Sequence, residues 1–207
     1  MFPLPRDVSV ASLKDGRLTG PNFEEILFQQ LVKYRDIPFK ATNLNGSSTT
    51  DVHIRFQHFI NLERNQFAPG TEHAESLVRG YAGYPRFDFI VGRTFIQVSV
   101  STFDVHNRGY ANISNAFDHY NNDPRDRNQI ELYLDTVFGG EHRAVIDSEG
   151  HFVVTKDDEP VLDFRIVYIR GSPGAPHHPQ LVKSYRDLQF INYEELKTIL
   201  FGDFLKS

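Results

Sequence analysis

The sequence predicts a mixed α/β fold, in which a central sheet has helices on both of its faces. Two observations lead to this prediction. Segments with apolar residues at helical spacing occur near both ends and in the middle of the chain. Between them, the stretch Tyr84–Thr102 contains two adjacent strand-like segments with no helix separating them. Interior strands that lie between helices are typical of sheets covered on both sides.

Length and composition favour one domain. The chain has 207 residues, of which 40% are hydrophobic, and its 18 Phe and 9 Tyr residues can supply a large aromatic core. We expect an irregular N-terminal arm over residues 1–20 and a single domain over residues 21–207. The sequence has no Cys, which excludes disulfide bonds and thiolate metal sites.

Charge and hydropathy limit the classes of partner. The net charge of −5 argues against a surface coated with positive charge for non-specific nucleic-acid binding, but a local basic groove remains compatible with it. We expect no membrane span, because the sequence has no apolar run of about 18 residues. The first ten residues lack a signal-peptide pattern, so we expect an intracellular protein or one whose targeting segment is absent from this sequence.

The first element is a helix that should begin at Pro21 and end near Arg35, before Pro38. Asn22 and Glu25 have the spacing of a capping box. The apolar residues that follow have helical spacing, so they should form the buried face of this helix.

Three weaker patterns follow the helix. Lys40–Thr50 is polar and predicts a loop, whereas the alternation along Asp51–Leu62 predicts a half-exposed strand. Asn61–Gly83 is ambiguous, and we expect a helical turn within it at Glu72–Leu77.

The strongest strand pattern lies in the stretch Tyr84–Thr102. It predicts strands at Arg86–Val91 and Thr94–Thr102, joined by a tight turn at Gly92 and Arg93. The second strand alternates, so that Gln97 and Ser99 share a face with Phe95, and Ile96 and Val98 lie on the other face.

The rest of the chain predicts helices, a hairpin and further strands. Asn192 and Glu195 again have capping-box spacing, at the start of the last helix. In chain order, we expect helices at Asn112–Tyr120 and Asp126–Phe138, a hairpin of Arg143–Ile146 with Phe152–Thr155, strands at Val161–Arg170 and Leu188–Ile191, and a terminal helix.

Asp88 is the first candidate for a functional site, because it is a carboxylate within an apolar strand. A carboxylate among apolar strand residues is costly unless it is paired, hydrogen-bonded or bound to a metal. On the next strand, Gln97 and Ser99 form a polar pair with the same orientation. This geometry fits a small metal-dependent phosphodiesterase site, and it equally fits a hydrogen-bonded sheet with no site.

The element order helix–β–β–β–helix–β is similar to the core of the restriction-endonuclease-like nucleases of the PD-(D/E)xK superfamily. This resemblance implies a catalytic, metal-binding role for Asp88, with Glu25 or Glu24 from the first helix as a further Mg²⁺ ligand. Gln97 stands at the position of the family's second acid and Ser99 at the position of its Lys. Carboxylates of such a site hold Mg²⁺, which polarises the phosphate and lowers the pKa of bound water.

Two of these positions depart from the family pattern. Gln97 offers only a neutral carbonyl ligand, and Ser99 carries no positive charge. The missing cation would have to come from Arg86, Arg93 or Arg55. A degenerate site of this kind is compatible with a weak Mg²⁺-dependent nuclease and with a domain that has lost catalysis.

Three segments, YPRFDFIVGRTFIQVSVS, RNQIELYLDTVFG and VLDFRIVYIRGSPG, resemble the C-terminal domain of the Crinkler-type effector proteins of fungi and oomycetes. The resemblance covers about residues 85–201. It implies a toxin-like domain related to nucleases that acts in a host nucleus. The sequence shows neither the family's targeting segment nor a P-loop.

The nuclease interpretation also suggests contacts with nucleic acid. Arg125 and Arg127 open the predicted helix Asp126–Phe138 and would contact the phosphate backbone together with Arg86 and Arg93. His106 follows the Gln97 strand and is a candidate general base or phosphate contact. The alternative is a catalytically inactive domain that acts by binding a host protein.

Overall fold

The structure is a computed structural model, and it describes residues 19–43, 48–84, 86–101, 107, 112–118, 125–171 and 184–200, without the side chains of 198–200. The described residues form a mixed α/β fold, which confirms the predicted fold class. The predicted arm at 1–20 lies almost wholly outside them. None of the helices in this part of the chain is long and apolar enough to cross a membrane.

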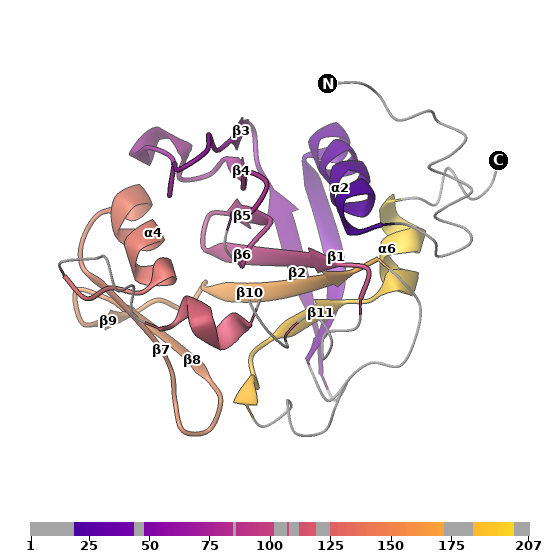
Figure 1. Cartoon of the computed structure of the whole chain (residues 1–207). Coiled ribbons are helices and arrows are strands. Elements are labelled where there is room, and N and C mark those ends of the chain that lie inside the picture. Colours follow the sequence, from indigo (N-terminus) through magenta and orange to yellow (C-terminus); the bar gives the residue numbers. More distant parts are fainter. Residues whose placement is uncertain are drawn as a thin grey trace.

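A mixed sheet dominates the described part of the chain, and its eight strands follow the order β2-β1-β11-β10-β6-β5-β4-β3 (Figure 1). A smaller sheet has the order β7-β8-β9. The strands of the large sheet are β1 (Asp36–Asn43), β2 (Thr49–Arg55), β3 (Phe59–Asn61), β4 (Leu77–Arg79), β5 (Phe89–Val91), β6 (Thr94–Ser99), β10 (Arg165–Arg170) and β11 (Gln189–Ile191), and those of the small sheet are β7 (His142–Ile146), β8 (Phe152–Lys156) and β9 (Glu159–Pro160).

Strands β4, β5 and β6 form an antiparallel meander in the middle of the chain. The chain then passes through α4 (Gln129–Phe138) and the small sheet before β10 pairs in parallel with β6. Strand β11 is parallel to β10 and antiparallel to β1. The sheet is therefore mixed, and its centre consists of strands that are buried on both faces.

Each face of the large sheet carries its own hydrophobic core. Helices α2 (Gly20–Tyr34) and α6 (Tyr193–Leu200) cover one face, where Leu27 and Leu196 pack with Ile96. Helix α4 and the small sheet cover the other face, where Tyr133 packs with Phe95. Figure 1 shows these two layers on opposite sides of β6 and β10.

The first helix begins earlier than its predicted capping box. Helix α2 starts at Gly20, with Thr19 as its N-cap and Pro21 in its first turn, so the prediction of Asn22 as the capping residue is wrong. Proline suits the first turn because the amide that it lacks would have no partner within the helix. The predicted end is confirmed, since Arg35 adopts a left-handed conformation (φ 60°) as the C-cap.

The predicted hairpin is confirmed as β5 and β6, although both strands are shorter than expected. Gly92 adopts φ 58° in the turn, a conformation that costs glycine little. The register pairs Phe89 with Ile96 and Ile90 with Phe95. The predicted alternation is also confirmed, because Ile96 belongs to the core under α2 and Phe95 to the core under α4.

The structure differs from the predicted elements where the sequence patterns of the N-terminal half are weak. Strand β1 runs to Asn43, into the segment predicted as a loop. The predicted strand 51–62 is two strands, β2 and β3, and the ambiguous segment contains the 3₁₀ helix η1 (Thr71–His73) and β4. Strand β4 has three residues, which is too short for an alternating pattern to be recognised in the sequence.

In the C-terminal half, the hairpin β7–β8 and the strand β11 confirm the predictions, and β10 confirms the predicted end at Arg170 but begins at Arg165, four residues later than predicted. Helix α4 ends at Phe138 as expected but begins at Gln129, where Asn128 and Glu131 form a capping box. The predicted helix 112–120 is the short 3₁₀ helix η2 (Ile113–Ala116) within its described part. Helix α6 begins directly after Asn192, but Glu195 accepts a hydrogen bond from the Lys40 amide on β1 (2.7 Å).

Candidate functional site

Asp88 lies directly before β5 and connects the two strands beside it. Its backbone amide donates to the Ile96 carbonyl on β6 (2.9 Å), and its carbonyl accepts from the Gly80 amide after β4 (3.0 Å). The carboxylate oxygen Oδ2 accepts from the backbone amide of Val98 (2.7 Å). The side chain therefore satisfies a β6 amide beyond the point where regular pairing with β5 ends.

A cavity of about 370 Å³, the Asp88 cavity, opens beside this carboxylate. Asp88 and Glu24 contribute carboxylates to its wall, and Arg79 contributes a guanidinium group. The cavity is lined by Pro21, Glu24, Asn61, Leu62, Arg79, Gly80, Tyr81, Ala82, Gly83, Tyr84, Phe87 and Asp88. It thus combines acidic, basic and aromatic groups from the N-terminal half of α2, from the ends of β3 and β4, and from the segment between β4 and β5.

Arg79 is the cation of this site. Its Nε and Nη2 atoms donate to Oε1 of Glu24 (3.1 and 3.0 Å), and its Nη1 atom donates to Oε2 of Glu25 (2.8 Å). The guanidinium group also lies 4.6 Å from the centre of the Phe28 ring. One arginine on β4 therefore holds two neighbouring glutamates of α2, of which Glu24 lines the cavity.

Burial raises the pKa of the Asp88 carboxyl to about 7. The hydrogen bond from the Val98 amide opposes this shift because it favours the ionised form. The negative charge of Glu24 adds to the rise, and the positive charge of Arg79 reduces it. A carboxyl group with this pKa exchanges its proton near neutral pH, which suits a group that transfers protons.

Gln97 and Ser99 do not line the cavity with the carboxylates of Asp88 and Glu24. Their neighbours Ile96 and Val98 belong to the core under α2, so alternation directs Gln97 and Ser99 to the opposite face of β6. Both are almost fully buried, with exposed fractions of 2% and 5%. Neither lines the Asp88 cavity. The structure therefore brings together Asp88, Glu24 and, through Arg79, Glu25.

The other predicted cations lie away from the cavity. Arg93 is at the far end of the hairpin, where it forms an ion pair with Asp163 (3.1 Å) and lies 4.1 Å from the centre of the Phe138 ring. Arg55 is exposed and lies 3.8 Å from Asp36. Arg86 precedes Asp88 by two residues in a left-handed conformation (φ 68°) but does not line the cavity.

Arg125 is exposed, and its predicted contact with nucleic acid stays a prediction. His106 lies outside the described residues, so its predicted role stays a prediction as well. Arg127 requires a correction. Its side chain is 4% exposed and forms ion pairs with Glu131 (2.8 Å), Asp135 (3.1 Å) and Glu141 (3.5 Å). A guanidinium group that is enclosed by three carboxylates is not available to a phosphate backbone.

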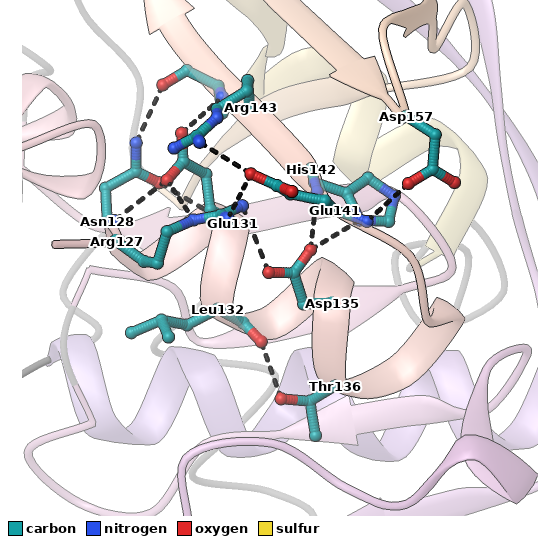
Figure 2. A network of polar contacts seen from close by, with 11 residues as sticks. Arg127, Asn128, Glu131, Leu132, Asp135, Thr136, Glu141, His142, Arg143 and Asp157 are labelled. Carbon is teal, nitrogen blue, oxygen red and sulfur yellow. Dashed lines mark hydrogen bonds and ion pairs between the residues drawn. The ribbon is translucent and has the colours of Figure 1, made fainter. Parts of the chain in front are cut away.

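Figure 2 shows the set that surrounds this arginine, which we name the Arg127 network and define as Arg127, Asn128, Glu131, Asp135, Glu141 and His142. Glu131 also accepts from the backbone amide of Ala144 (2.8 Å), and Asp135 accepts from both the amide (2.7 Å) and the Nδ1 atom (3.0 Å) of His142. The network joins the start of α4 to β7. Its role is thus to attach the small sheet to the helix.

The Asp88 cavity meets the basic requirement of a magnesium site. Mg²⁺ prefers oxygen ligands and is commonly held by one or two carboxylates, with water and substrate phosphates completing its shell. Asp88 and Glu24 supply such carboxylates, although Arg79 already binds Oε1 of Glu24. Among the described residues, no cluster of three or more Asp, Glu or His side chains has the arrangement of a metal site. The described donor set therefore consists of two carboxylates, one of which is already bound to Arg79.

Three residues of this site, Arg79, Tyr81 and Tyr84, were missed in the sequence analysis. Arg79 follows two apolar residues in a short run, Leu77–Arg79, and its importance depends on β4 lying next to α2. Tyr81 and Tyr84 lie in a Gly-containing segment that reads as a simple bend. The spacing Tyr81–Gly83–Tyr84 was the available clue, because it predicts a tight turn that presents two aromatic rings.

Comparisons of the chain with protein-family models, with curated proteins and with solved structures each find no match.

Proposed function

We propose that the chain is a nuclease-like effector domain that binds nucleic acid and hydrolyses its phosphodiester bonds with Mg²⁺. The observation that carries this proposal is the carboxylate pair of Asp88 and Glu24 on the wall of one cavity, with the pKa of Asp88 raised to about 7. Arg79 adds a positive charge beside both carboxylates.

The arrangement of the elements supports the same proposal. Helix α2 precedes the antiparallel meander β4–β5–β6, and after α4 the chain returns to place β10 parallel to β6. Apart from β1–β3 and the small sheet β7–β9, which are additional to it, this order is similar to the helix–β–β–β–helix–β order of the restriction-endonuclease-like nucleases. With the resemblance to Crinkler-type effectors, it makes a host nucleus the site of action that we propose.

The chemistry would divide among three side chains. A bound Mg²⁺ would polarise the scissile phosphate and lower the pKa of an attacking water. Asp88 and Glu24 would hold this cation, since both line the cavity. Arg79 would supply the positive charge that Ser99 lacks, since its guanidinium group lies on the cavity wall.

The test is cleavage of single-stranded DNA, RNA and plasmid DNA with Mg²⁺ or Mn²⁺ by the native chain and by Asp88→Ala. We expect the variant to lose at least about a hundredfold in rate, since a metal contributes several kcal/mol to such a transition state. Asp163→Ala is the matched control, because Asp163 is an exposed carboxylate at the far end of the hairpin. Cleavage that survives Asp88→Ala in a folded protein would refute the assignment of the site.

A second measurement separates the metal site from catalysis. We expect calorimetric titration with Mn²⁺ to give binding heat with the native chain and with Asp163→Ala, and none with Asp88→Ala. Since this measurement needs no substrate, it tests the carboxylate pair even if the wrong nucleic acid is chosen for cleavage.

The alternative function is a catalytically inactive domain of nuclease origin that acts by binding a host protein. Two observations favour it: neither Gln97 nor Ser99 lines the Asp88 cavity, and Arg79 already neutralises part of the charge of Glu24 and Glu25. Absence of both cleavage and Mn²⁺ binding by the native chain would support this alternative over the nuclease.

A further inference from the structure

The Asp88 cavity has an aromatic side that the carboxylate pair does not use. Tyr81, Tyr84 and Phe87 line the cavity with aromatic rings, whereas Glu24 and Asp88 line it with carboxylates. Its volume of about 370 Å³ is that of a pocket for a small organic group. A Mg²⁺ ion and its waters would leave this aromatic surface without a function.

The two tyrosines are fixed in position by the local structure. Tyr84 donates its hydroxyl hydrogen bond to the Phe67 carbonyl (2.7 Å), and its backbone amide bonds to the Tyr81 carbonyl (2.8 Å) across a turn in which Gly83 adopts φ 91°. The rings of Tyr81 and Tyr84 meet edge to face at 5.5 Å. Gly80 permits this packing, because a Cβ atom there would lie 2.7 Å from Cβ of Tyr84.

From this cavity, and resting on the proposed function, we infer that the substrate is single-stranded nucleic acid, one unpaired base of which stacks on Tyr81 beside the Asp88–Glu24 carboxylates. Planar bases stack on aromatic side chains without regard to sequence. Tyr81 is half-buried, so part of its ring remains accessible in the described structure.

Asn61 adds a group that can contact the base edge. It lines the cavity, its residue is exposed, and within the described residues its side-chain amide makes no hydrogen bond. An amide offers one acceptor and two donors, which match the edges of several bases. The cavity thus has a stacking surface and a polar group for one base.

Charge and size both argue against a duplex in this position. A paired base cannot enter a cavity unless it leaves its pair and its stack, which costs a few kcal/mol, whereas the bases of a single strand are already unpaired and leave at a lower cost. Duplex binding also depends on many cationic contacts with phosphate, and the chain has a net charge of −5. An unpaired strand needs fewer of these contacts because stacking contributes to its affinity.

The experiment measures the binding of fluorescent single-stranded DNA and RNA oligonucleotides, and of a duplex of the same DNA sequence, by anisotropy in EDTA at low salt. We expect a single strand to bind at least about tenfold more tightly than the duplex. Tyr81→Ala should weaken its binding by about tenfold, the loss of one stacked base, and Tyr81→Phe should retain it. Tyr34→Ala, which removes an exposed tyrosine at the end of α2, should have no effect.

Equal binding of duplex and single strand, no binding of any oligonucleotide, or an unchanged affinity of Tyr81→Ala would overturn the inference. Competition by a free mononucleotide as strong as that by the oligonucleotide would also overturn it, in favour of a nucleotide ligand. The cleavage assay keeps the two proposals apart. Single-strand binding that depends on Tyr81 without any cleavage leaves the inference standing and removes the hydrolase, and Asp88-dependent cleavage of duplex alone does the reverse.

Discussion

Two regions of the molecule place one arginine among several carboxylates, and they differ in what surrounds the charges. In the Arg127 network, the side chains of Arg127, Glu131 and Asp135 are at most 8% exposed and pair with one another. At the Asp88 cavity, Arg79 holds Glu24 and Glu25, and the three side chains have exposed fractions of 18–28%. Among the described residues, the carboxylate of Asp88 forms no ion pair and accepts a hydrogen bond from the Val98 amide.

The difference shows which region has its charges committed to structure. Each carboxylate of the Arg127 network has an additional backbone donor or a second cation, so its charge is neutralised within the protein. Asp88 has one backbone donor and a raised pKa, and it faces a cavity. A titratable group beside a cavity is available to a ligand, whereas a buried network of ion pairs indicates a structural connection.

The largest effect should come from a substitution in the Arg127 network, which we call the closed region; the Asp88 cavity is the open region. Arg127→Ala would leave buried carboxylates without their cation, and we expect it to lower the free energy of unfolding by about 3–5 kcal/mol. Urea denaturation measures this loss. Arg143→Ala is the control, because Arg143 contacts Glu141 of the same network (2.6 Å) from a side chain that is 55% exposed, and it should cost at most about 1 kcal/mol. Equal losses for the two variants would remove the distinction between closed and open regions.

The second effect concerns the pH dependence of the open region. Because the folded-state pKa of Asp88 is raised to about 7, the folded chain holds a proton that the unfolded chain has lost, and stability falls as pH rises from about 4 to 7. Asp88→Asn keeps an acceptor for the Val98 amide but removes this titration. We expect the variant to be about as stable as the native chain near pH 4 and roughly 3 kcal/mol more stable near pH 8.

Urea denaturation of both proteins across this pH range tests the prediction. Asp163→Asn, which changes a side chain that is 66% exposed, should track the native chain within about 0.5 kcal/mol at every pH. A constant difference between Asp88→Asn and the native chain would show that Asp88 does not titrate near neutral pH.

A smaller effect is expected when the cation of the open region is removed. Arg79→Gln should lower the free energy of unfolding by about 1–2 kcal/mol, less than Arg127→Ala because water screens the half-buried glutamates. It should also raise the pKa of Asp88 further, since the charge of Arg79 lowers that pKa. Carboxyl NMR titration of Asp88 measures the shift, and a lowered pKa would contradict the arrangement.

The contrast between the two regions also explains what could be predicted from the sequence. The hairpin β5–β6 was predictable because the turn at Gly92 and the alternation along β6 are local patterns. The fold class followed from such patterns. Asp88 was identified for a local reason as well, since it is a carboxylate within an apolar run.

The capping boxes show where local patterns fail. Asn22–Glu25, Asn192–Glu195 and Asn128–Glu131 have the same spacing, but the structure has a complete box at Asn128–Glu131. Glu25 instead bonds to Arg79, 54 residues away, and Glu195 accepts from the Lys40 amide, 155 residues away. Tertiary partners decided the roles of these glutamates, and for the same reason neither the importance of Arg79 nor the burial of Arg127 was visible in the sequence.

The smallest expected effect uses salt to separate the two regions. Salt screens charges that water can reach and has much less effect on buried pairs. The cost of Arg79→Gln should therefore decrease by about 0.5 kcal/mol when unfolding is measured in 1 M instead of 0.1 M NaCl, and the cost of Arg127→Ala should stay constant. Each variant is compared with the native chain at the same salt, so a general effect of salt on burial cancels. If both costs decreased equally, water would reach the Arg127 network as readily as the cavity, and the classification of the network as closed would be wrong.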